Sequence, residues 1–459
     1  MFETYDLVPR PSSHIKTLSR IGYTLKTAVG DILDNSIAAS AENIWIDLYP
    51  NPDLGNEIEL TIRDDGSGMN SSDLIENMRL SCKDPSQDRD ENDLGRFGSG
   101  LKTASFSQCR KLTVISKNIE SKSAAATWDL DLVEEENKWT LLFTKETSTN
   151  LFHDHAEFFK QHSGTVVIWR ALVKYADMDS LDLQNSLESD VASLKRYTAL
   201  YFHKFLSRRS KKISIFINRQ KIQAIDPFMR DAPGYQESPA ETFRIRKGGK
   251  IEIIPHIIPH ESKLTPEQIE SLGGVDGITA NQGLYVYRSD RLIIEGGWHG
   301  LARLSLLGRL ARVEVNVPSS LDDEWSTDVK KSTLEIPEKV KEKLKRLSVT
   351  PQKKSRRAYQ YRGKLDQENP FWHIRTNERT GKVSYEINPK NEELHALLKA
   401  LDDDDQQRAV LDYLQLLVKS LPLDNIFEKA ASKNIEQDVI DVEQLYKEIQ
   451  EAWKTVQLK

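Results

Sequence analysis

The sequence predicts an α/β protein: two α/β domains followed by a mainly helical C-terminal region. Three observations predict this class. Apolar residues recur every three or four positions at 25–37, which indicates a helix with one apolar face. Strands rich in apolar residues follow at 43–50 and 57–64. Helix and strand patterns alternate again after residue 173, and helical patterns prevail from residue 392 onward.

The composition of the 459-residue chain limits the function classes that fit it. The chain is 38% hydrophobic and 29% charged, has no apolar run long enough to span a membrane and lacks the apolar core of a signal peptide, so we expect a cytoplasmic protein. Its two cysteines, Cys82 and Cys109, lack metal-ligand spacing, which fits a reducing compartment. The net charge of −6 argues against a chain that coats nucleic acid throughout, but it is compatible with local basic patches.

The first domain is expected to span residues 1–172, including an N-terminal strap. After the strand at 57–64 we expect a short helix at 71–80, a polar stretch at 82–93 and a helix at 101–109. The remaining strands of this domain are predicted at 111–117, 124–132, 138–144 and 164–172.

Two polar residues lie together on one side of the predicted helix at 25–37. Asp31 and Asn35 are four residues apart, so they lie one helical turn from each other on the same side. Two oxygen-bearing side chains placed in this way could hold a metal-bound ligand. The alternative is that both only point toward water.

Two glycine clusters follow at positions suited to ligand binding. Asp64 directly ends a strand, and Gly66 and Gly68 let a ligand approach the backbone closely. The cluster at 95–100 precedes a helix, where backbone N–H groups form an anion-binding nest and Lys102 can add a charge. Taken alone, each cluster also fits a tight turn. A Rossmann site is not indicated because a polar, lid-like stretch precedes the second cluster, and no GK[ST] sequence follows it for a Walker A loop.

The order of these motifs resembles that of the GHKL ATPases, the superfamily of DNA gyrase B, the heat-shock chaperone, the histidine kinases and MutL. The sequence is most similar to the bacterial MORC-like branch, through "DILDNSIAA", "IRDDGSGM", "LGRFGSGLKTASFSQCRKLTVISK" and "SGTVVIW". The resemblance is strong over 15–172 and looser over 173–348. It implies an α+β sandwich of the Bergerat type that binds ATP and Mg²⁺, followed by a transducer-like α/β domain.

The resemblance also assigns roles to single residues. It makes Asn35 the protein ligand of the Mg²⁺ that bridges the phosphates, a role that fits the few protein oxygens this ion takes. Asp64 would accept a hydrogen bond from the adenine amino group, Gly66 and Gly68 would let the purine lie against the backbone, and Met69 would wall the pocket.

Further residues complete the nucleotide site that the resemblance implies. The phosphate-contacting lid would comprise Gly95, Arg96, Phe97, Gly98, Ser99, Gly100, Leu101 and Lys102. Thr165 would support the adenine and Asp64 through water. Met69 and Thr165 also fit ordinary core or strand positions.

The general base is the position where this sequence departs from most of its relatives. They carry glutamate four residues before the asparagine, whereas Asp31 stands here, one methylene shorter. The two acids have similar unperturbed pKa values, but a general base must reach its water. We predict that Asp31 is the base; the alternative is a site that only binds ATP. Asp34 faces the wrong way around the helix to share the ligand of Asn35, and Ala38 replaces an aspartate common in relatives.

Residues 173–348 are predicted to form the transducer-like domain, which in this superfamily sends a lysine to the γ-phosphate. The loop at 323–337 occupies the corresponding place. We predict Lys331 as this catalytic lysine, with Lys330 as the second choice; a solvated lysine pair is the alternative.

The rest of the chain is expected to hold a basic linker at 349–366 and a C-terminal domain at 367–459 made of a β-hairpin and helices. The linker and the basic cluster at 207–212 would contact DNA phosphates or simply be solvated.

Together these features predict a Mg²⁺-dependent ATPase whose lid closure and homodimerisation gate action on DNA or a partner protein. By analogy with bacterial MORC-like proteins, this action would belong to antiphage defence, beside a separately encoded effector. The alternative is a non-hydrolysing, ATP-sensing scaffold. A histidine kinase is disfavoured because His14 is the only histidine upstream of the nucleotide motifs.

Overall fold

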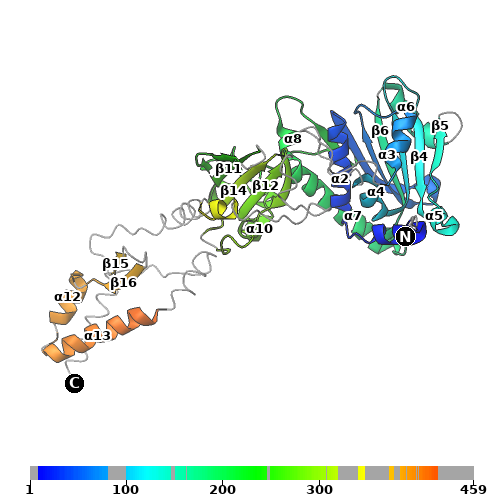
Figure 1. Ribbon diagram of the computed structural model, residues 1–459. Helices are drawn as coiled ribbons and strands as arrows, with labels where there is room; N and C mark the ends of the chain where they lie inside the picture. Colours follow the sequence, from blue (N-terminus) through cyan, green and yellow to red (C-terminus); the bar gives the residue numbers. More distant parts are fainter. Residues whose placement is uncertain are drawn as a thin grey trace, which may run out of the picture. The chain divides into compact units, whose positions relative to one another are not determined.

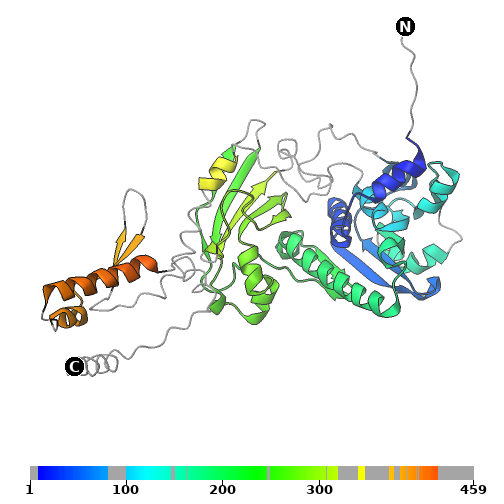
Figure 2. The same cartoon turned by 90° about the horizontal axis from the view of Figure 1, so that it is seen from below.

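The computed structural model divides the chain into two compact units, residues 1–304 with 308–354 and residues 305–307 with 355–459. Across the whole chain, the structure describes residues 9–80, 100–145, 150–161, 163–244, 249–305, 308–318, 340–346, 372–376, 383–388, 390–399, 401 and 403–421. The predicted α/β class is confirmed, because helices and two mixed sheets make up the first unit (Figures 1 and 2).

Eight strands among the described residues form the first sheet, in the order β5-β4-β3-β6-β2-β1-β7-β8. Their bounds are β1 Asn43–Asn51, β2 Glu57–Asp64, β3 Cys109–Lys117, β4 Ala124–Asp129, β5 Leu142–Lys145, β6 Gly164–Leu172, β7 Ser214–Ile217 and β8 Gln220–Lys221. The strands predicted at 43–50, 57–64, 111–117 and 164–172 are therefore confirmed. A short 3-10 helix, Pro52–Leu54, connects the first two of these strands.

The helices of this domain cover both faces of the sheet. Their bounds are α1 Pro11–Ser19, α2 Leu25–Ala38, α3 Ser71–Met78, α4 Gly100–Phe106, α5 Leu130–Glu136, α6 Asn150–Gln161, α7 Ser180–Tyr201 and α8 His203–Ser207. On β6, Val167 and Trp169 belong to the main core with α2, α4 and α7, whereas Val166 and Ile168 pack with Phe159 of α6. Successive strand residues point to opposite faces of the sheet. Helix α6 therefore covers the face opposite the main core.

The first sheet continues beyond Leu172, where we placed the end of the first domain. Strand β7 pairs in parallel with β1, and Ile215 and Ile217 are fully buried in the same core as Ile44 and Ile46. The chain reaches this edge of the sheet through α7 and α8, as a parallel pairing requires a long crossover.

Two predicted strands are shorter in the structure than the sequence suggested. The strand expected at 124–132 ends at Asp129, whose carboxylate accepts a hydrogen bond from the Leu132 N–H and so starts helix α5. The strand expected at 138–144 begins only at Leu142.

The second sheet contains six strands among the described residues, with β10-β11-β14-β12-β13 in order and β9 paired with β11. The bounds are β9 Gln236–Glu237, β10 Glu241–Arg244, β11 Lys250–Ile257, β12 Gly283–Arg288, β13 Arg291–Glu295 and β14 Ala311–Val317. The short helices α9 Pro266–Ser271 and α10 Gly274–Ala280 precede β12, and residues 340–346 are also helical. Val340 and Leu344 pack into the core of this sheet with residues such as Val313 and Val315.

The second unit contains the predicted C-terminal hairpin and helices. Strands β15 Trp372–Thr376 and β16 Val383–Ile387 pair antiparallel, and helices α12 Glu392–Lys399 and α13 Asp404–Ser420 follow. Asp403 caps α13 by accepting from the Asp405 N–H. The basic linker predicted at 349–366 and a further helical pattern at 438–453 lie outside the described residues. In the part of the chain that the structure describes, no helix combines the length and apolar character needed to cross a bilayer.

Candidate functional site

Helix α2 carries the first predicted site residues, and a capping box fixes where it begins. The side chain of Thr24 accepts a hydrogen bond from the Thr27 N–H, and the Thr27 hydroxyl lies 3.0 Å from the Thr24 N–H in return. Leu25, Val29 and Leu33 face the core, as the periodicity predicts. Asp31 and Asn35 therefore lie one turn apart on a helix whose orientation is fixed at its start.

The carboxylate of Asp31 is buried beside Tyr23, in the segment before α2, and beside the start of α4. Its Oδ2 accepts a hydrogen bond from the hydroxyl of Tyr23 at 2.9 Å, and the Asp31 side chain as a whole is almost inaccessible. A Cβ placed on Gly100 would lie 3.6 Å from the same oxygen, so the first residue of α4 adjoins Asp31. The structure thus brings the predicted base next to the end of the predicted phosphate loop.

Asn35 is exposed, whereas its neighbour Ser36 is buried and points toward the second motif. The Ser36 hydroxyl donates to Oδ2 of Asp64 at 2.9 Å, which connects α2 to the end of β2. Sequence reasoning missed Ser36, because a lone serine on a helix carries no signal of the strand that it contacts. This hydrogen bond places the two motifs side by side.

Asp64 is a buried acid in a polar socket. Oδ1 accepts from the Gly66 N–H at 3.0 Å, and the residue is only 5% exposed. Burial raises the pKa of the Asp64 carboxyl to about 6, although the hydrogen bonds from Gly66 and Ser36 act in the opposite direction. With a pKa of about 6, the Asp64 carboxyl is mostly ionised at neutral pH and accepts hydrogen bonds.

Glycine is required in the loop after β2 and at the start of β6 because other backbone passes close to both segments. Gly68 has φ +64°, and a Cβ there would lie 1.9 Å from the carbonyl oxygen of Lys117. At Gly164, φ is +143° and a Cβ would lie 1.9 Å from the carbonyl oxygen of Asp64. Gly66 is also confined, since its Cβ would lie 2.8 Å from the carbonyl oxygen of Ala39. The predicted adenine-side loop is therefore tightly fitted to its surroundings.

Ser116 on β3 organises the strand ends around this loop. Its hydroxyl lies 2.9 Å from the Thr165 hydroxyl, donates to the Gly164 carbonyl at 3.1 Å and accepts from the Met69 N–H at 2.9 Å. Thr165 pairs directly with Asp64 across β2 and β6, and Met69 is partly buried against the main core. Thr165 is thus next to Asp64, and Ser116, a further residue that the sequence analysis missed, connects Met69 to Thr165.

Lys102 is buried in α4 and contacts another helix. Its ammonium group donates to the carbonyl oxygen of Asn77, near the C-terminal end of α3, at 2.7 Å. A cation at this end of a helix is electrostatically favourable. Gly100 and Leu101 lie with it at the start of α4.

Part of the predicted site lies outside the described residues. This applies to the lid residues Gly95, Arg96, Phe97, Gly98 and Ser99, and to the lysine choices Lys330 and Lys331.

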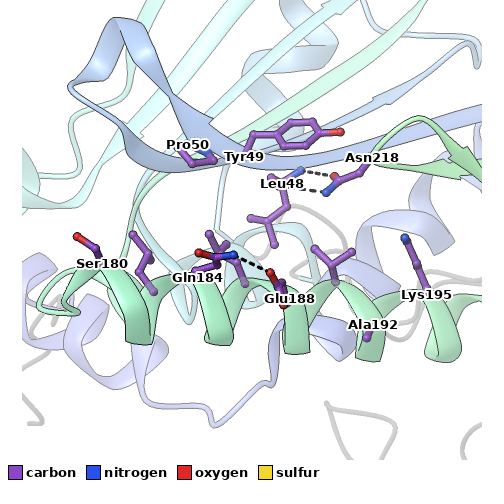
Figure 3. Close-up of a pocket in the computed structure, with 12 residues that line it drawn as sticks. Leu48, Tyr49, Pro50, Ser180, Gln184, Glu188, Ala192, Lys195 and Asn218 are labelled. Carbon is purple, nitrogen blue, oxygen red and sulfur yellow. Dashed lines mark hydrogen bonds between the residues drawn. The ribbon is translucent and has the colours of Figure 1, made fainter.

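An apolar groove lies elsewhere on this domain, between β1 and α7 (Figure 3). Leu48 and Pro50 form one wall, and α7 residues such as Leu187 and Val191 form the other. The Asn218 side chain bonds both the N–H and the carbonyl of Leu48, at 2.9 and 3.3 Å, and Pro50 has no N–H to donate. None of the predicted nucleotide-binding residues is among those that line the groove.

Comparison with known proteins identifies the class of the first domain. Residues 23–165 match the family described as histidine kinase-, DNA gyrase B- and HSP90-like ATPase. This stretch runs from Tyr23 to Thr165 and contains α2, the loop after β2 and the start of α4. Residues 23–165 are therefore similar to the GHKL-type ATPases, and the match covers less than half of the chain.

A curated relative points to the MORC-like branch within this superfamily. The chain is 30% identical to the ATPase morc-1 of Caenorhabditis elegans over 91 residues, which are 20% of this chain and 10% of that protein. The similarity thus spans about a tenth of the length of the curated relative.

Proposed function

We propose that the chain binds Mg·ATP and hydrolyses it slowly at the site formed by α2, the loop after β2 and the start of α4. The observation that carries this proposal is the hydrogen bond from Ser36 to Asp64. It holds the helix of Asp31 and Asn35 against the acid and glycines suited to a purine. The family match over this stretch supports the same assignment.

Asn35 is chemically suited to hold the metal ion. Among the polar residues of its turn, Asp31, Asp34 and Ser36 are buried and Asn35 is exposed. An amide oxygen is a hard donor, and Mg²⁺ characteristically takes few protein ligands together with phosphate oxygens and water. Bound there, the ion would neutralise charge on the phosphates.

Asp31 would accept the proton of the attacking water. Tyr23 holds its carboxylate by a 2.9 Å hydrogen bond, which fixes the oxygen that faces the start of α4. The lid residues 95–102 would bind the phosphates through backbone N–H groups, and Lys331 would contact the γ-phosphate. Asp64 would select the adenine, Thr165 would support it through water, and Met69 would line the pocket.

A non-hydrolysing, ATP-sensing scaffold is the second candidate. The buried, tyrosine-bound aspartate in place of the longer glutamate favours it, because a shorter side chain reaches less far toward a water. The two candidates share the binding site and differ only in the rate of hydrolysis.

We further propose that nucleotide binding drives homodimerisation and so gates action on DNA or on a partner protein, in antiphage defence beside a separate effector. The basic cluster at 207–212 supports a DNA contact. Arg208 pairs with Asp290, but Arg209, Lys211 and Lys212 are exposed. Replacing these three by glutamine should weaken DNA binding and lower its salt dependence. Sedimentation with and without a non-hydrolysable ATP analogue tests the dimer.

Phosphate release and equilibrium ATP binding test the nucleotide site. We expect Asp31→Asn to lower the rate of phosphate release by about 100-fold or more while ATP binding remains. Asn35→Ala should abolish the Mg²⁺ dependence of ATP binding. Asp73→Asn, at an exposed helix position, is the matched control and should change neither.

The two candidates give different results in this experiment. An unchanged rate in Asp31→Asn contradicts the base assignment, and a wild-type protein that binds ATP without releasing phosphate favours the scaffold. Normal Mg·ATP binding by Asn35→Ala contradicts the whole site.

A further inference from the structure

Helix α2 presents a second pair of residues beside the pair that faces the nucleotide site. Gly30 and Asp34 are four residues apart, like Asp31 and Asn35, and each precedes a member of that pair by one residue. They therefore occupy the adjacent face of the same helical turn, about 100° around the axis. Asp34 is only 1% exposed, so this face is covered.

Arg291, the first residue of β13 in the second sheet, covers this face. Its Nε donates to Oδ1 of Asp34 at 2.9 Å, and both side chains are buried. Nη2 donates to the Tyr197 hydroxyl at 2.8 Å, and Nη1 donates to the Leu292 carbonyl at 2.9 Å. A strand of the second sheet is thus joined directly to the helix that carries the nucleotide residues.

Aromatic rings from α7 and the residue after it hold the guanidinium in place. Its central carbon lies 3.9 Å from the centre of the Phe202 ring, and Tyr197 stacks on Tyr201 at 4.3 Å. Burial alone would lower the pKa of Arg291, but Tyr197 and Asp34 more than offset this, so the net shift is upward and the side chain stays charged. A planar cation fixed by a carboxylate, a hydroxyl and a carbonyl has little freedom to move without its partners.

Gly30 allows this close approach. A Cβ at Gly30 would lie 2.7 Å from the Tyr197 hydroxyl and 3.0 Å from Nη2 of Arg291. Any larger residue would push Tyr197 and Arg291 away from α2. The contact depends on shape as well as on charge.

We propose that Arg291 is a positioning residue that couples occupancy of the nucleotide site to the β12–β13 hairpin. The proposal deepens the proposed ATPase function and rests on it. Asp34 adjoins Asn35 on a rigid helix, so a displacement of α2 caused by ligand binding at Asn35 also displaces the carboxylate that Arg291 holds. The reverse also follows, because coupling between two sites is reciprocal.

A buried ion pair supports a coupling role better than a purely stabilising one. Removing two charges from water is costly, and apolar residues of similar volume often stabilise a core equally well. The pair instead imposes one defined geometry between α2 and β13. If its role were only structural, replacing it would change stability but not the response of β13 to nucleotide.

Hydrogen–deuterium exchange of residues 283–295, with and without a non-hydrolysable Mg·ATP analogue, tests the proposal on the full chain. In the wild type we expect nucleotide to slow exchange in the hairpin by about tenfold. In Asp34→Asn, which keeps shape and one acceptor oxygen, analogue binding should persist while the difference falls below about twofold. Thermal unfolding confirms that each variant remains folded.

Two further variants separate coupling from damage to the fold. Gly30→Ala alters the contact without removing a charge and should also abolish the nucleotide-dependent difference. Glu295→Gln is the matched control: it removes the ion pair between Arg196 of α7 and the same strand β13, which does not involve α2, and should retain the full difference.

The outcomes distinguish failure of the coupling from failure of the proposed function. A nucleotide-dependent difference that survives in both Asp34→Asn and Gly30→Ala overturns the proposal, as does its absence in a wild-type protein that binds the analogue. A wild-type protein that does not bind the analogue refutes the proposed function itself, and the coupling with it.

Discussion

The hydroxyl of Tyr23 donates a 2.9 Å hydrogen bond to Oδ2 of Asp31, and both residues are buried. Tyr23 precedes the Thr24 cap of α2, so the same segment that starts the helix also orients its carboxylate.

We expect Tyr23→Phe to lower kcat for ATP hydrolysis by about tenfold or more and to leave KM within about twofold. A hydrogen bond to a charged group contributes about 1.5–3 kcal/mol, and here it positions the base without touching the substrate. Steady-state phosphate release measures both parameters. Tyr49→Phe, at a half-exposed tyrosine of β1, is the control. An unchanged kcat in Tyr23→Phe would show that the hydroxyl does not position the base.

The glycine loop gives a test of stability with a matched control. Gly55 and Gly68 have nearly the same left-handed φ, +67° and +64°, but a Cβ at Gly55 meets nothing within 4 Å. Gly55→Ala should therefore cost only backbone strain, about 1 kcal/mol of unfolding free energy. Gly68→Ala adds the clash with Lys117 and should cost about 3 kcal/mol or more.

Urea unfolding followed by tryptophan fluorescence compares these two variants. Equal losses of unfolding free energy would mean that Lys117 moves aside without cost.

Much of the first domain could be predicted because its signals are local in sequence. Strand alternation, the apolar helix face and the two glycine clusters each lie within a short segment. Asp31, Asn35, Asp64, Gly66 and Gly68 were all singled out in this way, and the structure brings them together through the bond from Ser36.

The residues that could not be predicted act across large distances in the chain. Strand β7 joins β1 about 170 positions away, and Arg291 meets Asp34 across 257 positions. The sequence around a single arginine or serine carries no pattern that indicates which distant residue it contacts. For the same reason, sequence reasoning placed Asp34 off the nucleotide site but could not say what it contacts.

The pKa of Asp64 predicts how ATP affinity depends on pH. The free protein holds this carboxyl at about 6, and an adenine amino group donating to it would favour the ionised form and lower its pKa in the complex. Affinity should therefore be full above pH about 6 and fall toward acid pH, by up to about tenfold per pH unit. Isothermal titration calorimetry between pH 5 and 8 measures this dependence.

The variant Ser36→Ala shows whether Asp64 is the group responsible. The Ser36 hydroxyl donates to the ionised carboxylate, so its loss should move the midpoint upward by about 0.5–1 pH unit. The phosphates of ATP titrate in the same range but contribute equally in both proteins. Ser72→Ala, at an exposed position on α3, should leave the midpoint unchanged. A midpoint identical in Ser36→Ala would assign the pH dependence to another group.

Asp64 also predicts which base the site accepts. Above its titration point the carboxylate only accepts hydrogen bonds, so it matches the amino group of adenine and repels the carbonyl oxygen of guanine in a buried socket. We expect GTP to bind at least about 100-fold more weakly than ATP at pH 7.5, because a buried polar group left without its partner is strongly penalised. At pH 5.5 the protonated carboxyl can donate to that oxygen, and the ratio should shrink. Competition against a fluorescent ATP analogue at both pH values measures it, and equal affinities at pH 7.5 would show that Asp64 does not face the base.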